Sequence, residues 1–237
     1  MMQRHKKMSS QIKKKSYLCI MVLTFFELDK VTNEVFDSWL KKLPKFRQDV
    51  VLRYRFRDDR VRSLCAYLLL CAGLGRIVEN FSYNEHGKPL LIDETLHINL
   101  SHAKSAVIAG FSEAPIGVDV EFIRKTYPKI VCKRVFTPTE IEQIETSENS
   151  TLTFFKLWTL KESFVKCVGQ GLSFPLKTVE FTIAPTNVVV CSDERFTFST
   201  FTQNEHQISI CSTEQHIVKT LNFAEFSKAI SEIRDKR

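Results

Sequence analysis

Two acidic residues in the middle of the chain have a spacing that suits metal chemistry. Residues 117–121 read Gly-Val-Asp-Val-Glu, so apolar and acidic side chains alternate. Successive side chains of a β-strand point to opposite faces, and Asp119 and Glu121 therefore project from one face. Two neighbouring carboxylates repel each other unless a cation joins them, and oxygen ligands suit a hard divalent ion such as Mg²⁺. From this segment alone, an edge strand with a solvated acidic face explains the pattern equally well.

A second segment, 155–166, places an aromatic, an acidic and a basic residue on one stripe of a predicted helix. Trp158, Glu162 and Lys166 stand at positions i, i+4 and i+8, which share a helix face. The alternative is an ordinary amphipathic helix with a weak Glu162–Lys166 surface pair. That alternative leaves Lys161 unexplained, because this lysine lies beside the apolar stripe.

A Ser-His pair follows the first of two short strand-like runs. The runs 97–100 and 106–111 predict a hairpin with Ser101 and His102 at its tip. By itself such a pair is more typical of a hydrogen-bonded turn than of a ligand site. A hydrolase nucleophile is excluded, because adjacent residues on a hairpin point to opposite sides and no nucleophile-elbow pattern surrounds Ser101.

Taken together, these motifs resemble a known family. Gly-Val-Asp-Val-Glu followed by Trp-Thr-Leu-Lys-Glu-Ser-Phe-Val-Lys is similar to the paired signature of the surfactin-type 4'-phosphopantetheinyl transferases. These enzymes move the phosphopantetheine arm of coenzyme A onto a serine of an acyl or peptidyl carrier protein and release 3',5'-ADP. The resemblance covers most of the chain from about Tyr17 to Phe181 and includes the segments 87–89, 99–102, 136–140 and 169–173.

The resemblance implies roles for the acids and lysines of both motifs. Asp119, Glu121 and Glu162 would bind Mg²⁺, and Glu162, or a water that it holds, would take the proton from the incoming serine. Lys161 and Lys166 would lie at the phosphates of coenzyme A, the co-substrate. Glu162 and Lys166 are thus the predicted catalytic residues.

Four further residues are assigned to coenzyme A by the same resemblance. Ser101 and His102 match the family's contact to the 3'-phosphate, and Lys88 matches a lysine near the adenosine. Segment 44–63 corresponds to a basic helix of the family that ends in Arg62, a further predicted ligand. Where relatives have lysines early in this helix, the chain has Phe46 and Asp49, and no ligand is assigned there.

The predicted elements favour an α+β fold. They form a pseudo-dimer of two similar halves, each a small, mostly antiparallel sheet packed with helices. We expect a basic tail at 1–15, an N-terminal half at 16–115 and a C-terminal half at 116–237 that carries the metal-binding acids. The expected elements are a first strand at 17–26, a helix capped by Asp58 and Asp59 and stopped by Gly73 and Gly75, a strand at 118–121, helices at 139–146 and 152–168, and strands at 179–183, 188–191, 196–201 and 208–212.

Composition limits the partners and the compartment. The 237 residues carry a net charge of +7, which favours an anionic partner, here an acidic carrier protein. We expect no nucleic-acid binding, because zinc-finger, helix-turn-helix and RNP-like patterns are lacking. Seven scattered cysteines indicate free thiols of a cytoplasmic protein. The sequence has no stretch of about 20 apolar residues, so we expect no membrane span.

We further expect a monomer. A relative that binds coenzyme A without transferring the arm is the alternative, and its mark would be a lost metal-binding acid, whereas all three are present.

Overall fold

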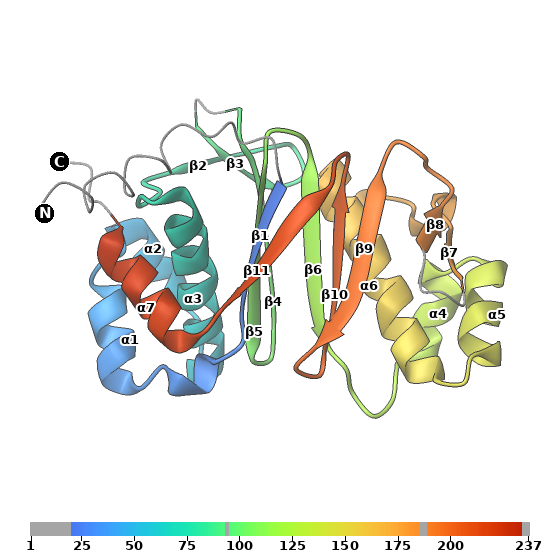
Figure 1. The fold of residues 1–237 in the computed structure, drawn as a ribbon, viewed down its shortest axis with the longest axis horizontal. Coiled ribbons are helices and arrows are strands. Elements are labelled where there is room, and N and C mark those ends of the chain that lie inside the picture. The colour runs from blue at the N-terminus through green and yellow to red at the C-terminus, as the bar shows by residue number, and fades with distance from the viewer. Residues whose placement is uncertain (1–19, 93–94, 185–188, 234–237) are drawn as a thin grey trace, which may run out of the picture.

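The computed structural model describes residues 20–92, 95–184 and 189–233. The predicted basic tail, the start of the predicted first strand at 17–19, and residue 188 of a later predicted strand lie outside these ranges. Two sheets stand side by side at the centre of the molecule, and each is covered on its outer side by helices (Figure 1). The predicted α+β pseudo-dimer of two sheet-and-helix halves is confirmed.

The first half is a four-stranded sheet packed against one long helix. The strand order is β11-β1-β5-β4, in which β11 (His216–Leu221) comes from the end of the chain, and all neighbours are antiparallel except β1 and β11. Helices α1 and α2 pack on α3, and the small β2-β3 ribbon contacts it through Phe81, whose ring lies 6.4 Å from that of Tyr67. The elements of this half are β1 (Ile20–Phe25), α1 (Asn33–Leu40), α2 (Lys45–Leu52), α3 (Arg57–Leu74), β2 (Phe81–Tyr83), β3 (Pro89–Leu91), β4 (His97–Ala103) and β5 (Ala106–Ser112), with a short 3-10 turn at Leu28–Lys30.

Helix α3 is the buried centre of this half. Every residue from Ser63 to Cys71 is buried, as expected for a helix that is enclosed on all sides. Gly75 ends the helix with a φ of 67°, a left-handed conformation that glycine adopts without strain. The prediction that Asp58 and Asp59 cap the helix is wrong, since the N-cap is Phe56 and both acids lie in the first turn. Their charges there still favour the helix dipole.

The β4-β5 hairpin turns later than predicted. Ser101 pairs with Ile108 and His102 with Val107, so both lie within strand β4 and not at its tip. The tip is the two-residue turn Lys104–Ser105, where Lys104 has a φ of 43°. Two-residue hairpin turns need such left-handed backbone to match the strand twist, and here a lysine supplies it without the usual Asn or Gly signal.

The second half repeats this plan with three strands and helix α6. The order is β6-β10-β9, all antiparallel, and α6 packs on β6 and β10. Its elements are β6 (Ile116–Phe122), α4 (Lys129–Val135), α5 (Pro138–Thr146), α6 (Ser150–Val168), β7 (Phe181–Ile183), β8 (Val189–Cys191), β9 (Thr197–Gln203) and β10 (His206–Ser212), with 3-10 turns at Gly171–Ser173 and Leu176–Thr178.

The end of the chain returns to the first half. Strand β11 (His216–Leu221) pairs in parallel with β1, and helix α7 (Phe223–Glu232) places the Phe226 ring 4.5 Å from Phe25 and 5.4 Å from Trp39. Sequence patterns predicted neither element, and they assigned all of 116–237 to the second half. The contacts show that 216–232 pack on the first half, because β11 completes its sheet and α7 covers its core.

A third core joins the halves between the two sheets. It includes Ile108 from the first sheet and Val118, Val120 and Ile208 from the second, all buried. The edge strands β4 and β6 meet there, where the Val118 N–H donates to Asn99 Oδ1 at 2.8 Å. The acidic side chains of β6 alternate with these buried valines.

Two general findings concern the described part of the chain. None of its helices combines the length and apolar character needed to cross a membrane. Its six cysteines, Cys65, Cys71, Cys132, Cys167, Cys191 and Cys211, are all free thiols.

Candidate active site

Strand β6 lies directly on helix α6, and Gly117 makes this contact possible. A Cβ atom on Gly117 would lie 1.9 Å from the carbonyl oxygen of Ser163 and 2.4 Å from the amide nitrogen of Cys167. These are backbone atoms, which cannot rotate away as a side chain can, so a larger residue would push the strand off the helix. The close approach brings Asp119 against Lys166. The sequence motif contained Gly117, but no role was predicted for it.

Asp119 is the centre of a buried polar cluster at the joint of the two halves. Its Oδ1 accepts hydrogen bonds from Lys166 Nζ at 2.5 Å and from Ser101 Oγ at 2.9 Å. Lys166 also donates to Ser101 Oγ at 3.0 Å. The second oxygen, Asp119 Oδ2, is buried and accepts no hydrogen bond from any residue in the described ranges. A buried carboxylate oxygen without a partner is costly, so this atom is available to a ligand.

Two further acids, Glu121 and Glu162, lie near Asp119, and their surroundings disfavour the ionised form. Burial, followed by the negative charge of Asp119, raises the pKa of both Glu121 and Glu162. The Trp158 indole N–H donates to Glu121 Oε1 at 3.3 Å and offsets part of this effect. A divalent cation would favour the ionised form of both glutamates.

The donor set fits a hard cation in its chemistry. Asp119 offers an oxygen that has no partner among the described residues, and burial raises the pKa of both glutamates although Lys166 acts on each of them and Arg124 on Glu121. Across the described residues, however, no three His, Cys, Asp or Glu side chains are already gathered so that they could hold a metal ion. Lys166 supplies the positive charge that pairs with Asp119 in this arrangement.

Positive charge accumulates on the β4 side of the cluster. Desolvation by the surrounding protein, and then the charges of Arg62 and Lys166, lower the pKa of His102. Arg62 Nη1 donates to the Lys104 carbonyl at 2.9 Å, and its Nη2 pairs with Asp59. These contacts hold the arginine of α3 against the β4-β5 turn. His102 and Ser101, as neighbours on a strand, face opposite sides, and Ser101 already donates its only hydroxyl proton to Asp119.

A cavity of about 340 Å³ opens beside Glu162 and Lys166. Its lining comes from the β2-β3 turn, strand β4, the end of α6 and the 3-10 turns that follow: His86, Gly87, Lys88, Pro89, Asn99, Leu100, Glu162, Val165, Lys166, Gly169, Gly171, Phe174 and Leu176. Lys88 Nζ donates to the carbonyls of Cys167 at 3.1 Å and Ile116 at 3.3 Å, and burial lowers its pKa. The lysine therefore caps the negative end of the α6 dipole at the cavity wall.

The prediction that Lys161 lies at the coenzyme A phosphates is wrong. Its side chain is fully buried on another face of α6, since five residues correspond to a rotation of about 140° from Lys166. Lys161 Nζ lies 2.9 Å from Glu140 Oε2 and donates to the carbonyls of Leu176 at 2.8 Å and Val179 at 2.7 Å. All three protons of the ammonium are thus directed at protein acceptors.

The structure therefore brings most of the predicted site residues together. Asp119, Lys166 and Ser101 are in direct contact, while Glu121, Glu162, His102 and Arg62 surround them and Lys88 lies across the cavity. The sequence patterns did not identify Asn99, whose side chain bonds β4 to β6 and lines the cavity. Its position immediately before Leu100 and Ser101, within the family-like segment 99–102, is the signal that could have found it.

Comparison with known proteins places this arrangement in context. A family model described as the 4'-phosphopantetheinyl transferase superfamily matches residues 115–220, which include all three predicted metal-binding acids. The 4'-phosphopantetheinyl transferase gsp of Aneurinibacillus migulanus is 34% identical over 161 residues, covering 63% of this chain and 67% of that protein. The 4'-phosphopantetheinyl transferase Sfp of Bacillus subtilis is 34% identical over 160 residues, covering 63% and 69%.

Among solved structures, the holo-[acyl-carrier-protein] synthase of Thermotoga maritima matches 44% of this chain and 64% of its own. Its sequence identity is 20% and the TM-score is 0.37, a likeness too low to support an inference.

Proposed function

Since the chain belongs to the 4'-phosphopantetheinyl transferase superfamily, as a member of its surfactin type, we propose that it transfers the phosphopantetheine arm of coenzyme A to a serine of an acyl or peptidyl carrier protein. The supporting observation is the cluster at the joint of the halves. There a buried aspartate with one unpartnered oxygen contacts a lysine, and two glutamates with raised pKa lie beside it.

For this reaction the enzyme must supply a proton acceptor and positive charge, but not the nucleophile. The attacking serine belongs to the partner, and its oxygen displaces 3',5'-ADP at the β-phosphorus of coenzyme A, so catalysis consists of positioning and electrostatic stabilisation. Glu162, directly or through a water, is the proposed proton acceptor. Its side chain lines the cavity next to Lys166, which places a carboxylate beside the proposed binding site of coenzyme A. Lys166 is the proposed partner of the leaving phosphate.

Asp119, Glu121 and Glu162 are the proposed ligands of Mg²⁺. When bound, the ion offsets the negative charge of these acids and of the pyrophosphate. The unpartnered Asp119 Oδ2 and the raised pKa of both glutamates support this assignment.

Coenzyme A is the proposed ligand of the cavity and of the basic groups at its side. Lys88 lines the cavity, while Arg62, His102 and Lys166 present donors to phosphate. The lowered pKa keeps His102 neutral near pH 7, so it acts as a hydrogen-bond donor and not as a cation. Ser101 contributes through Asp119, because its hydroxyl proton is donated there.

A cytoplasmic location and a monomeric state are also proposed. The free thiols among the described cysteines support a reducing compartment. Sedimentation of the purified chain and fractionation of the source cells test these two points.

Intact-mass spectrometry of apo carrier proteins tests the proposed function. A carrier incubated with the enzyme, coenzyme A and Mg²⁺ should gain the mass of one phosphopantetheine arm, and omission of coenzyme A should abolish the gain. Chelation of divalent ions should also stop the reaction, and an unchanged rate would refute the metal role of the acids. Failure to modify any carrier in a panel from fatty acid, polyketide and peptide synthesis would refute the transferase activity.

A further inference from the structure

The loop 52–57, made of residues 53–56 between α2 and α3 and of one flanking residue from each helix, exposes an unusual run of side chains. All residues from 52 to 58 are exposed, among them Leu52 at 42%, Tyr54 at 40% and Phe56 at 62% of their full surface. Arg53, Arg55 and Arg57 alternate with these apolar residues. Exposure of bulky apolar side chains to water is unfavourable, so a cluster of them beside arginines is typical of a surface that binds a partner.

Hydrogen bonds to neighbouring segments hold the loop in shape. Arg60 Nε donates to the Tyr54 carbonyl at 2.8 Å, and Arg57 donates to Asn33 Oδ1 at 2.8 Å and to the Val31 carbonyl at 2.7 Å. These bonds fix the backbone at two points, which lowers the entropy lost when a partner binds.

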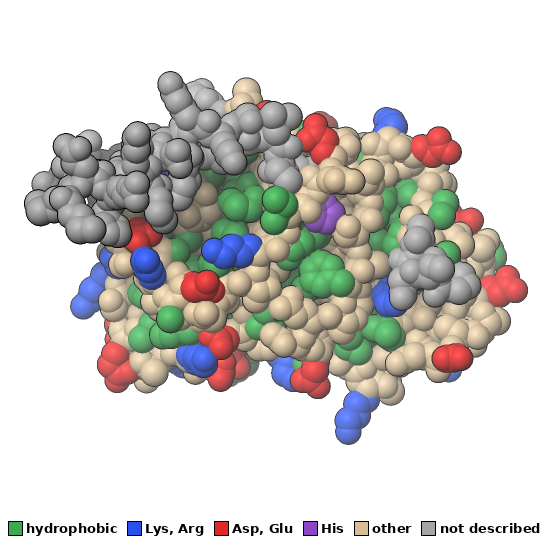
Figure 2. All heavy atoms as spheres, in the orientation of Figure 1, with side chains coloured by type: hydrophobic (Ala, Val, Ile, Leu, Met, Phe, Trp, Pro, Cys, Tyr) green, Lys and Arg blue, Asp and Glu red, His purple; other side chains and the backbone are tan. Residues whose placement is uncertain are grey.

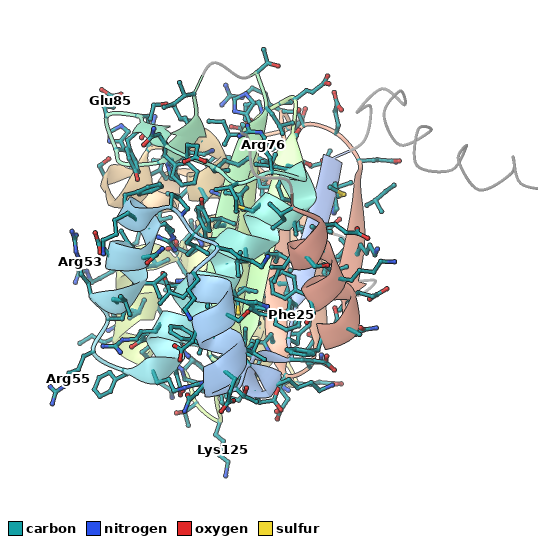
Figure 3. All side chains as sticks on the ribbon, turned by 90° about the vertical axis from the view of Figure 1, so that its left-hand side faces the viewer. Phe25, Arg53, Arg55, Arg76, Glu85 and Lys125 are labelled. Carbon is teal, nitrogen blue, oxygen red and sulfur yellow. The ribbon has the colours of Figure 1, made fainter. Side chains whose placement is uncertain are left out.

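The side chains of two arginines in this loop are left without a polar partner. Within the described residues, the guanidinium groups of Arg53 and Arg55 form no hydrogen bond or ion pair, and that of Arg55 only lies over the Phe56 ring at 5.4 Å. Both side chains project from the molecule into solvent (Figure 3). Their charges are therefore available to an acidic partner.

The loop is continuous with the candidate active site. Arg57 and Arg62 line the same cavity of about 220 Å³ with Lys104, and Arg62 bonds to the Lys104 carbonyl at the β4-β5 turn. The charge of Arg62 also acts on His102, two residues before that turn. A partner that reaches Asp119 from this side would pass over the loop.

We propose that the loop 52–57 is a docking surface for the acidic carrier protein, an inference that rests on the proposed function. The carrier must bring its serine into the site between β4 and α6, so it must also cover protein surface beside that site. Six consecutive loop residues contain three arginines and no acid, whereas the face crossed by β11 intersperses charges of both signs (Figure 2). Arginine and aromatic residues are the types that contribute most to such contacts.

Charge reversal on the loop tests the proposal in the full-length enzyme. Arg53→Glu/Arg55→Glu should raise the KM for an apo carrier protein about tenfold, because these charges accelerate encounter with an acidic partner. The kcat and the KM for coenzyme A should stay near the wild-type values. Phe56→Ser, which leaves the charge unchanged, should also raise the carrier KM. Added salt should raise the carrier KM of the wild type more than that of the charge-reversed variant.

A matched control lies on β11, at the sheet edge opposite β4. Ile217, 60% exposed, and Lys219, also exposed, present an apolar and a basic side chain there, and Lys228 of α7 is 76% exposed. Ile217→Ser/Lys219→Glu/Lys228→Glu lowers the net charge by four, as the loop variant does, and should leave the carrier KM unchanged. An equal rise in that control would mean that net charge, and not the loop, governs the carrier KM, and would overturn the proposal.

Two further outcomes separate docking from function. If the wild type transfers the arm but the loop variants keep a carrier KM within about twofold, the docking surface is wrong and the transferase function stands. If Ile130→Asp on α4, where Ile130 is 82% exposed, raises the carrier KM and the loop variants do not, the carrier docks on α4 instead. Absence of transfer by the wild type would overturn the proposed function itself.

Discussion

Replacing Lys161 by methionine should destabilise the protein while sparing the phosphate contacts of its substrate. The ammonium pairs with Glu140, and both side chains are buried. Removing one partner of a buried ion pair typically costs about 3–5 kcal/mol, because the other charge is left uncompensated.

The hydrogen bonds that remain around Glu140 favour the lower end of this range of free-energy costs. Glu140 keeps hydrogen bonds from the Thr137 and Phe181 amides, both at 2.9 Å, whereas the carbonyls of Leu176 and Val179 lose their donor. We therefore expect a loss of about 3 kcal/mol, which for a chain of this size lowers Tm by roughly 6–12 °C.

Thermal and urea unfolding measure the loss, and a second substitution identifies its cause. Lys161→Met/Glu140→Gln should recover part of the stability, because the uncompensated charge is gone. Lys166→Met is the matched control on the same helix. This variant also leaves a buried carboxylate, Asp119, without its cation, so Tm should fall here too, but the variant should in addition show a large fall in kcat that Lys161→Met does not show.

The competing assignment of Lys161 to coenzyme A predicts the reverse. A phosphate ligand would leave Tm almost unchanged and raise the Kd for coenzyme A about tenfold to hundredfold, since a bond to a charged group contributes roughly 1.5–3 kcal/mol. That result would refute the structural role deduced from the buried contacts.

Four further predictions follow from the site and the core. Asp119→Ala should lower kcat on the order of a hundredfold in the carrier mass assay, and near-wild-type turnover of the folded variant would exclude a catalytic role. Gly117→Ala should cost about 3 kcal/mol in urea unfolding, because its Cβ would overlap the Ser163 carbonyl, and an unchanged midpoint would contradict the close strand-helix contact. His102→Ala should weaken coenzyme A about tenfold or more but hardly affect 3'-dephospho-coenzyme A in calorimetric titrations, and a coupling below about 0.5 kcal/mol would remove the 3'-phosphate contact. Burial lowers the pKa of His206, so the folded state resists its protonation. The free energy of unfolding at about pH 6.5 and above should therefore fall as the pH drops to about 5.5, and it should fall less steeply in His206→Phe. Urea unfolding curves at both pH values would measure this difference.

Local patterns predicted the long helices and the core of the second sheet. The region 152–168 was predicted as helical and belongs to α6, because its apolar spacing and the following Gly169 act within the segment itself. Alternation in 117–121 likewise set the acids on one strand face and the valines on the other, as burial of Val118 and Val120 shows.

Long-range contacts account for what the patterns missed. Strand β11 is short and partly exposed, and it is a strand because β1 offers a free edge to pair with. No local signal marks that pairing, since the two strands are almost 200 residues apart in the chain. The position of the β4-β5 turn depends on Lys104 adopting a left-handed backbone conformation, which a lysine does not predict as Asn or Gly would.

The sequence by itself determined which residue types are present for chemistry, and the tertiary structure decided which of them meet. Lys161 and Lys166 are both lysines of the same motif, but they lie on different faces of helix α6. Lys161 forms a buried ion pair with Glu140, whereas Lys166 pairs with Asp119. Likewise, one oxygen of the Asp119 carboxylate is buried without a hydrogen-bond partner among the described residues because strands β4 and β6 and helix α6 enclose it. A motif specifies identity and spacing along the chain, whereas burial and partner geometry arise from segments that are distant in sequence and close in space.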